Sequence, residues 1–205
     1  MEEDKIINNY YRSKKFALVN KGDNFLFNKT LTYLKPGFNE KILEIGCGRG
    51  FFVKKIEKFT KFAVGIDVNP EAIKNSVSSK IKLADATNTN FPSASFDKIY
   101  SLHTIEHVPN LKKLFSEIDR ILKPGGKVLL VYPWELIRGI GAIVAALIIF
   151  KNPFYCRKIH LHKIYPSKIK KIIKDSNLEH VESHFIPFKF PQFFTILKKR
   201  SVVYW

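Results

Sequence analysis

Three glycines at alternate positions, Gly46, Gly48 and Gly50, directly follow the apolar run of residues 41–45. The run predicts a strand, and residues 51–58 predict a helix with an apolar face. Glycine lets the backbone turn sharply and approach a ligand without a Cβ in the way. The helix would direct its unpaired N–H groups at the same place. The pattern therefore predicts a site for a dinucleotide phosphate or another polar small molecule.

The spacing of these glycines narrows the range of possible ligands. A dinucleotide fingerprint requires G-x-G-x-x-G. Here the third glycine comes one residue early, and Phe51 holds the expected position. The spacing therefore disfavours NAD and FAD.

Two acidic residues come after the next apolar runs. Asp67 closes residues 62–67, and Asp85 follows residues 80–84. A carboxylate can accept hydrogen bonds from two vicinal hydroxyls. Asp67 as a helix N-cap and Asp85 as a solvated loop residue are the alternatives, and both stay open.

Short apolar runs alternate with helical stretches along the chain, which predicts an α/β fold. We expect seven strands in a mostly parallel sheet with helices on both faces, an antiparallel final strand and a helical insertion after the fifth strand. The chain is expected to form one domain, 1–205. Its parts would be N-terminal lid helices (1–35), a cofactor-binding core (40–133), a substrate-side insertion (134–165) and a closing helix with strands (166–205). The last two strands are expected at 178–186 and 194–204.

The segment ILEIGCGRG, residues 42–50, resembles the first motif of class I, Rossmann-like S-adenosylmethionine-dependent methyltransferases. FPSASFD, SLHTIEHVPN and LKPGGKVLLVYP resemble later motifs in order, so the resemblance covers roughly residues 40–133. The chain is most similar to the small-molecule and lipid-precursor branch, which includes quinone-biosynthesis methyltransferases.

The resemblance implies S-adenosylmethionine as the cofactor. It places Asp67 at the ribose hydroxyls and Asp85 near the adenine amino group. The full set of cofactor-binding residues that it implies is Glu44, Gly46, Cys47, Gly48, Gly50, Asp67, Val68, Asp85, Ala86, Leu102 and His103. Tyr10 and Tyr11 would fold over the pocket as a lid.

Methyl transfer mainly requires that the methyl donor and the acceptor are held in the correct position. A base is needed only if the acceptor atom carries a proton until the transition state. His103 and His107 follow the run 96–102, at the sheet edge where ligands bind. We predict His107 as the base and His103 beside the cofactor, while helix-start histidines without a chemical role remain the alternative. His160 and His162 have no acidic residue nearby in sequence, so we expect no metal.

Residues 139–150 are uncharged and lie between Arg138 and Lys151. A run this short cannot span a bilayer, so it predicts either a membrane-surface helix or a buried core helix. The net charge of +17 favours anionic partners or reflects a lysine-rich composition.

We therefore predict an enzyme that methylates a small apolar, quinone-like or lipid-linked acceptor, in contact with an anionic membrane. The charge suggests RNA (tRNA) methylation as an alternative, but no N-P-P-Y motif or RNA-binding module supports it. A catalytically silent cofactor-binding or membrane scaffold is the third reading. No apolar leader follows the acidic start, so we expect a cytoplasmic protein, peripheral at the inner membrane face. The oligomeric state is not predicted.

Overall fold

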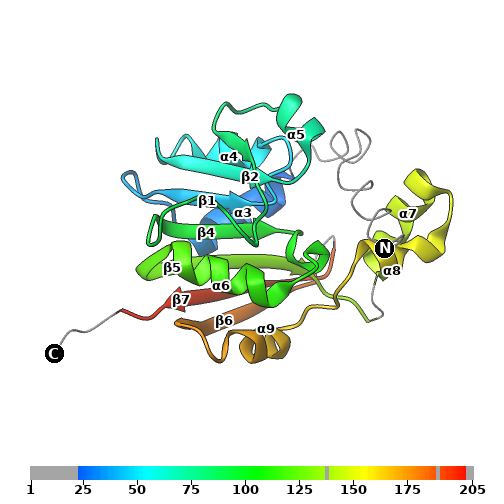
Figure 1. Ribbon diagram of the computed structural model, residues 1–205. Helices are drawn as coiled ribbons and strands as arrows, with labels where there is room; N and C mark the ends of the chain where they lie inside the picture. The colour runs from blue at the N-terminus through cyan, green and yellow to red at the C-terminus, as the bar shows by residue number, and fades with distance from the viewer. Residues whose placement is uncertain (1–22, 137–138, 188–189, 202–205) are drawn as a thin grey trace.

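The computed structural model describes residues 23–136, 139–187 and 190–201. They form a seven-stranded sheet in the order β3-β2-β1-β4-β5-β7-β6 (Figure 1). Neighbouring strands from β3 to β5 are parallel, and β7 alone runs antiparallel to both neighbours, β5 and β6. The strands are β1 (Ile42–Ile45), β2 (Ala63–Asp67), β3 (Ile81–Leu83), β4 (Phe96–Leu102), β5 (Leu122–Pro133), β6 (Leu178–Ile186) and β7 (Gln192–Lys199). The predicted fold class is confirmed.

Helices cover both faces of the sheet, because each face carries an apolar cluster. One cluster packs Leu114 and Ile118 of one helix with Ile169 of another, and the second packs Phe27 and Phe52. The helices are α3 (Asn24–Leu34), α4 (Phe51–Ile56), α5 (Pro70–Lys74), α6 (Leu111–Ile121), α7 (Ile143–Phe150), α8 (Cys156–Ile159) and α9 (Pro166–Ile173), with 3₁₀ turns η1 (Ile105–His107), η2 (Ile140–Ala142) and η3 (Pro153–Tyr155).

Side-chain caps fix where several helices begin. The Asn110 side chain accepts from the N–H of Lys113 at 3.0 Å, as its position before α6 predicts. Asp23 caps α3 by accepting from the N–H of Phe25 at 2.6 Å. These caps hold α3 and α6 in place against opposite faces of the sheet.

The insertion between β5 and α9 carries η2, α7, η3 and α8, and lies beyond the carboxyl ends of the parallel strands (Figure 1). The apolar run 139–150 is a 3₁₀ turn followed by α7, and Gly139, with a left-handed φ of 85°, directly precedes the turn. No helix in the described ranges is both long and apolar enough to cross a bilayer. Tyr10 and Tyr11 lie outside the described residues.

Strand β5 begins at Leu122, where its pairing with Phe96 of β4 starts. Strand β7 is shifted toward the N-terminus of the expected 194–204, since its register pairs Gln192 with Pro133. The hydrophobic periodicity of a sequence does not by itself fix where a strand begins or ends. Here β5 includes Gly125 and Gly126, and β7 includes Phe193 and Phe194.

Buried hydroxyls join the last three strands. Tyr132 and Thr195 are both fully buried, with their oxygens 2.7 Å apart, and Ser183 Oγ lies 2.8 Å from Thr195 Oγ1. Replacing Thr195→Val should lower the free energy of unfolding by about 1–3 kcal/mol, because the Tyr132 hydroxyl loses its partner. Urea denaturation measures this loss. The double variant Y132F/T195V should recover part of it, and an unchanged loss in the double variant would contradict the explanation.

Candidate active site

The three glycines after β1 all have left-handed backbones, with φ values of 75° at Gly46, 53° at Gly48 and 80° at Gly50. A Cβ built on Gly46 would lie 2.1 Å from Thr104 Oγ1, and one on Gly50 would lie 2.8 Å from Ile81 Cγ2. A Cβ on Gly48 would meet no atom within 4 Å. Gly46 and Gly50 are thus required by packing, whereas Gly48 leaves space for a ligand.

A pocket opens beside this loop. Five of the predicted cofactor residues line it: Glu44, Gly46, Cys47, Leu102 and His103. The prediction missed Asp23, Leu26, Arg49, Phe51 and Phe52, which also line the pocket. Arg49, Phe51 and Phe52 could have been found because they flank the glycines in sequence. Asp23 and Leu26 come from the start of α3, which the motifs do not reach.

Asp67, at the end of β2, ties this strand to the glycine loop. Its Oδ2 accepts from the N–H of Gly48 at 2.7 Å, and its Oδ1 accepts from the N–H of Asn69 at 2.8 Å. Burial raises the pKa of Asp67, and these backbone donors oppose that rise. The N-cap of α5 is Asn69 rather than Asp67. The helix-cap alternative for Asp67 therefore does not hold, and its carboxyl group faces Gly48.

The remaining predicted residues lie near the same edge without lining the pocket. Asp85 is exposed, and its Oδ1 accepts from both the N–H and the hydroxyl of Thr87 at 2.8 Å. Val68 is exposed, and the partly buried Ala86 packs against the core. The adenine role of Asp85 stays a prediction.

The two predicted histidines face different surroundings. His103 lines the pocket with a left-handed φ of 48°, and its Nε2 lies 2.9 Å from Gln192 Oε1. His107 Nδ1 lies 2.9 Å from the Ile159 carbonyl, and burial lowers the pKa of His107 to about 3. A group with that pKa is a weak base, and His107 is not among the residues that line the pocket. The geometry favours His103 over His107 for contact with a ligand in the pocket.

Comparison with known proteins agrees with this arrangement. Residues 43–130 match the family model described as a methyltransferase domain. This region is similar in sequence to methyltransferase domains, and the chain has the fold of a solved putative methyltransferase of Bacillus halodurans. Another solved structure with the same fold is phosphoethanolamine N-methyltransferase 2 of Haemonchus contortus, in complex with phosphomonomethylethanolamine and S-adenosylhomocysteine. Its TM-score is 0.70 at 16% identity, covering 98% of this chain and 58% of that one.

Curated relatives match the core of the chain. Sterol 24-C-methyltransferase ERG6B of Gibberella zeae is 38% identical over 112 residues, which are 49% of this chain and 29% of the relative. Phosphoethanolamine N-methyltransferase 1 of Arabidopsis thaliana is 42% identical over 108 residues, which are 47% of this chain and 21% of the relative. The matches therefore span less than a third of these relatives.

Glu44 is a buried carboxyl group in the lining of the pocket that has no cationic partner among the described residues. Its side chain is buried and accepts from the Tyr100 hydroxyl at 3.0 Å. Burial raises the pKa of Glu44 to about 8, and the charge of Asp67 adds to the rise. In the described part of the chain no lysine, arginine or histidine forms an ion pair with Glu44. A cationic ligand would supply the missing charge.

Cys47, beside Glu44, serves as apolar filler in the loop. The residue is buried, and burial raises the pKa of its thiol, so the thiol stays protonated. A built Cβ on Gly65 would lie 2.8 Å from Cys47 Sγ, which shows how tightly the thiol packs against β2.

The raised pKa of Glu44 predicts a pH-dependent effect on stability. Between the ordinary value of 4.5 and about 8, the folded chain keeps a proton that the unfolded chain has released, so stability falls as pH rises through this window. Glu44→Gln removes this penalty. In thermal denaturation without ligand, the Tm of E44Q relative to wild type should rise from about pH 5 to about pH 8.

Glu57 provides a control of opposite sign. Hydrogen bonds from Ser78 and Lys54 lower the pKa of Glu57 despite partial burial. Its stabilising contribution is present above the unfolded pKa and is lost as pH falls. The variant E57Q should therefore be less stable than wild type at neutral pH, and this difference should shrink in acid. A pH-independent Tm difference for E44Q would refute the assigned titration.

Proposed function

We propose that this protein binds S-adenosylmethionine in the pocket beside the glycine loop and transfers the methyl group to a small apolar or lipid-linked acceptor. The observation that carries the proposal is the pocket itself. In a chain of net charge +17, it is lined by the two carboxyl groups of Glu44 and Asp23 together with the guanidinium of Arg49. A ligand with a sulfonium, an ammonium and a carboxylate group suits such a pocket.

The residues present fit that cofactor. The glycine loop is open at Gly48, where a Cβ would meet no atom within 4 Å, and Glu44 would compensate the positive charge of the methionine part. Asp67 would receive the ribose hydroxyls at the tip of β2. The cofactor supplies an already activated methyl group, so Leu102 and His103 need only exclude water and orient the acceptor.

The insertion supports the proposed acceptor class. Large apolar side chains are exposed on it or at its base: Trp134, Leu136, Ile140, Val144, Leu147 and Phe154. Lys151 and Arg157 are exposed next to them. Apolar side chains beside basic ones suit the surface of an anionic membrane, where each basic residue contributes roughly 1 kcal/mol. Two relatives of the core are named for sterol and phosphoethanolamine methylation, which also favours an acceptor derived from lipids.

Asp67→Ala tests the cofactor assignment. We expect isothermal titration calorimetry to show S-adenosylmethionine affinity weakened by tens of fold, because the ribose hydroxyls lose their acceptor. The exposed Asp175 offers a matched control, and D175A should bind as wild type does. Equal affinities for D67A and wild type would remove Asp67 from the site.

Methyl transfer to a lipid is tested with anionic vesicles that carry a total lipid extract, using S-adenosylmethionine labelled in its methyl group. The label should enter the organic phase, and the protein should sediment with the vesicles. Replacing Val144 and Leu147 by aspartate should reduce both signals several-fold, since the exposed apolar contact is lost. The control variant is F38D, because Phe38 is exposed and precedes β1, away from the insertion.

Two outcomes would count against the lipid acceptor. Label found only in water-soluble small molecules would leave the methyltransferase assignment and remove the lipid. Label found in added tRNA, with retention that falls steeply as salt rises, would favour RNA as the acceptor.

A further inference from the structure

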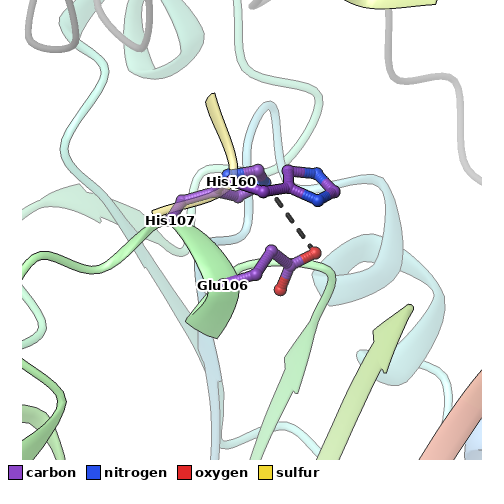
Figure 2. Close-up of side chains that lie close together, drawn as sticks. All are labelled: Glu106, His107 and His160. Atoms are coloured by element: carbon purple, nitrogen blue, oxygen red, sulfur yellow. Dashed lines mark ion pairs between the residues drawn. The ribbon is translucent and has the colours of Figure 1, made fainter. Parts of the chain in front are cut away.

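Three side chains from distant parts of the chain meet between the sheet edge and the insertion. Glu106 and His107 belong to η1, whereas His160 directly follows α8. Their ligand atoms all lie within 4.8 Å of one another, and Figure 2 shows the side chains gathered at one place. Glu106 is 1% exposed and His160 7% exposed. Such a group of buried polar side chains needs a physical explanation.

The hydrogen bonds of the two imidazoles fix which ring nitrogen carries the proton. His107 Nδ1 lies 2.9 Å from the Ile159 carbonyl oxygen, so Nδ1 must donate. His160 Nδ1 lies 2.7 Å from Glu135 Oε1, while the other Glu135 oxygen accepts from the N–H of Gly139 at 3.1 Å. In a neutral imidazole with its proton on Nδ1, Nε2 carries a lone pair. A carbonyl or carboxylate that holds the far nitrogen is the usual companion of a metal-binding histidine.

Glu106 supplies a third donor. Its Oε1 lies 3.8 Å from His107 Nε2, and the dashed line in Figure 2 marks this contact. Its Oε2 is buried and has no hydrogen-bond partner among the described residues. An unpartnered buried carboxyl oxygen is costly, and a bound cation would satisfy it.

We propose that Glu106, His107 and His160 bind a divalent transition-metal ion of the zinc type. Two imidazole nitrogens and one carboxylate oxygen form a common zinc ligand set that leaves one position open. Bonds of about 2.0–2.2 Å would place tetrahedral ligands roughly 3.4 Å apart, so the widest separation of 4.8 Å must close by about 1.4 Å. Binding of the ion would have to draw the ligand atoms together by that amount.

The proposal overturns the reason for expecting no metal from the sequence. His160 and His162 have no acidic neighbour in sequence, but the fold brings Glu106 and Glu135 to His160. His162 does not join the group, because its Nε2 lies 3.0 Å from the Val108 carbonyl oxygen. The expected pair of histidines is thus divided, and only one of them faces the acidic residues.

The ion would lie one side chain away from the pocket. His103 lines the pocket, and its Nδ1 lies 3.8 Å from Glu106 Oε1. The open coordination position would take water or an oxygen atom of the acceptor. That role rests on the proposed function, whereas binding of the ion does not.

Zinc binding by the full chain tests the proposal without S-adenosylmethionine, so its failure is distinct from failure of the proposed function. After treatment with a chelator, wild type should bind one equivalent of Zn²⁺ in competition with a chromophoric chelator. Glu106→Gln and His160→Gln should each weaken binding by at least about tenfold. The control is H180Q, which removes a partly buried histidine of β6 that contacts Ser183.

Glu135 is a positioning residue in this scheme. E135Q keeps all three proposed ligands but weakens the hydrogen bond to His160, so it should cost about 10–100-fold in zinc affinity. Wild-type affinity in E106Q and H160Q, or less than one equivalent in wild type, would overturn the proposal.

X-ray absorption spectroscopy of the zinc-loaded wild type tests the ligand set directly. It uses no variant, so its result does not depend on whether a variant folds. Two imidazoles and one further oxygen or nitrogen ligand from the protein support the site. A shell that contains sulfur from Cys47 or Cys156, or oxygen from water alone, contradicts it.

Discussion

The hydrogen bond from the Gly48 N–H to Asp67 joins the two halves of the pocket edge. It connects the loop after β1 to the tip of β2, and it requires the left-handed backbone that Gly48 adopts. Thr104 fixes the loop from the other side, because it fills the space where a Cβ on Gly46 would lie. With both contacts in place, the loop is held where Gly46, Cys47 and Arg49 line the pocket.

Buried carboxyl groups are concentrated at one edge of a strongly basic protein. Glu44 and Asp67 lie beside the glycine loop, and Glu106 and Glu135 lie beneath the insertion. The pKa values of Glu44 and Glu106 are both raised, mainly by burial, so both are costly to ionise without a compensating cation. The two proposals answer the same electrostatic problem in neighbouring places, one with an organic cation and the other with a metal ion.

Local sequence could predict the glycine loop and the parallel core, because hydrophobic period and glycine spacing act within a few residues. It could not predict that Asp23 joins the pocket, since this contact depends on where α3 docks. Nor could it bring His160 to Glu106, because more than fifty residues of sheet and helix separate them. For the same reason His107 looked like a base in sequence, while in the fold its Nδ1 faces the Ile159 carbonyl and its environment makes it weakly basic.

The contact between His103 and Gln192 has a consequence for the order of assembly. His103 follows β4, but the residue that holds its ring begins β7, almost ninety positions later. Strand β7 pairs with β6 on one side and with β5 on the other, so this contact exists only once β7 has docked on β5. The glycine loop depends on contacts within the first half of the sheet, whereas this wall of the pocket is finished only when the β6–β7 hairpin docks. Ligand affinity is thereby linked to docking of that hairpin.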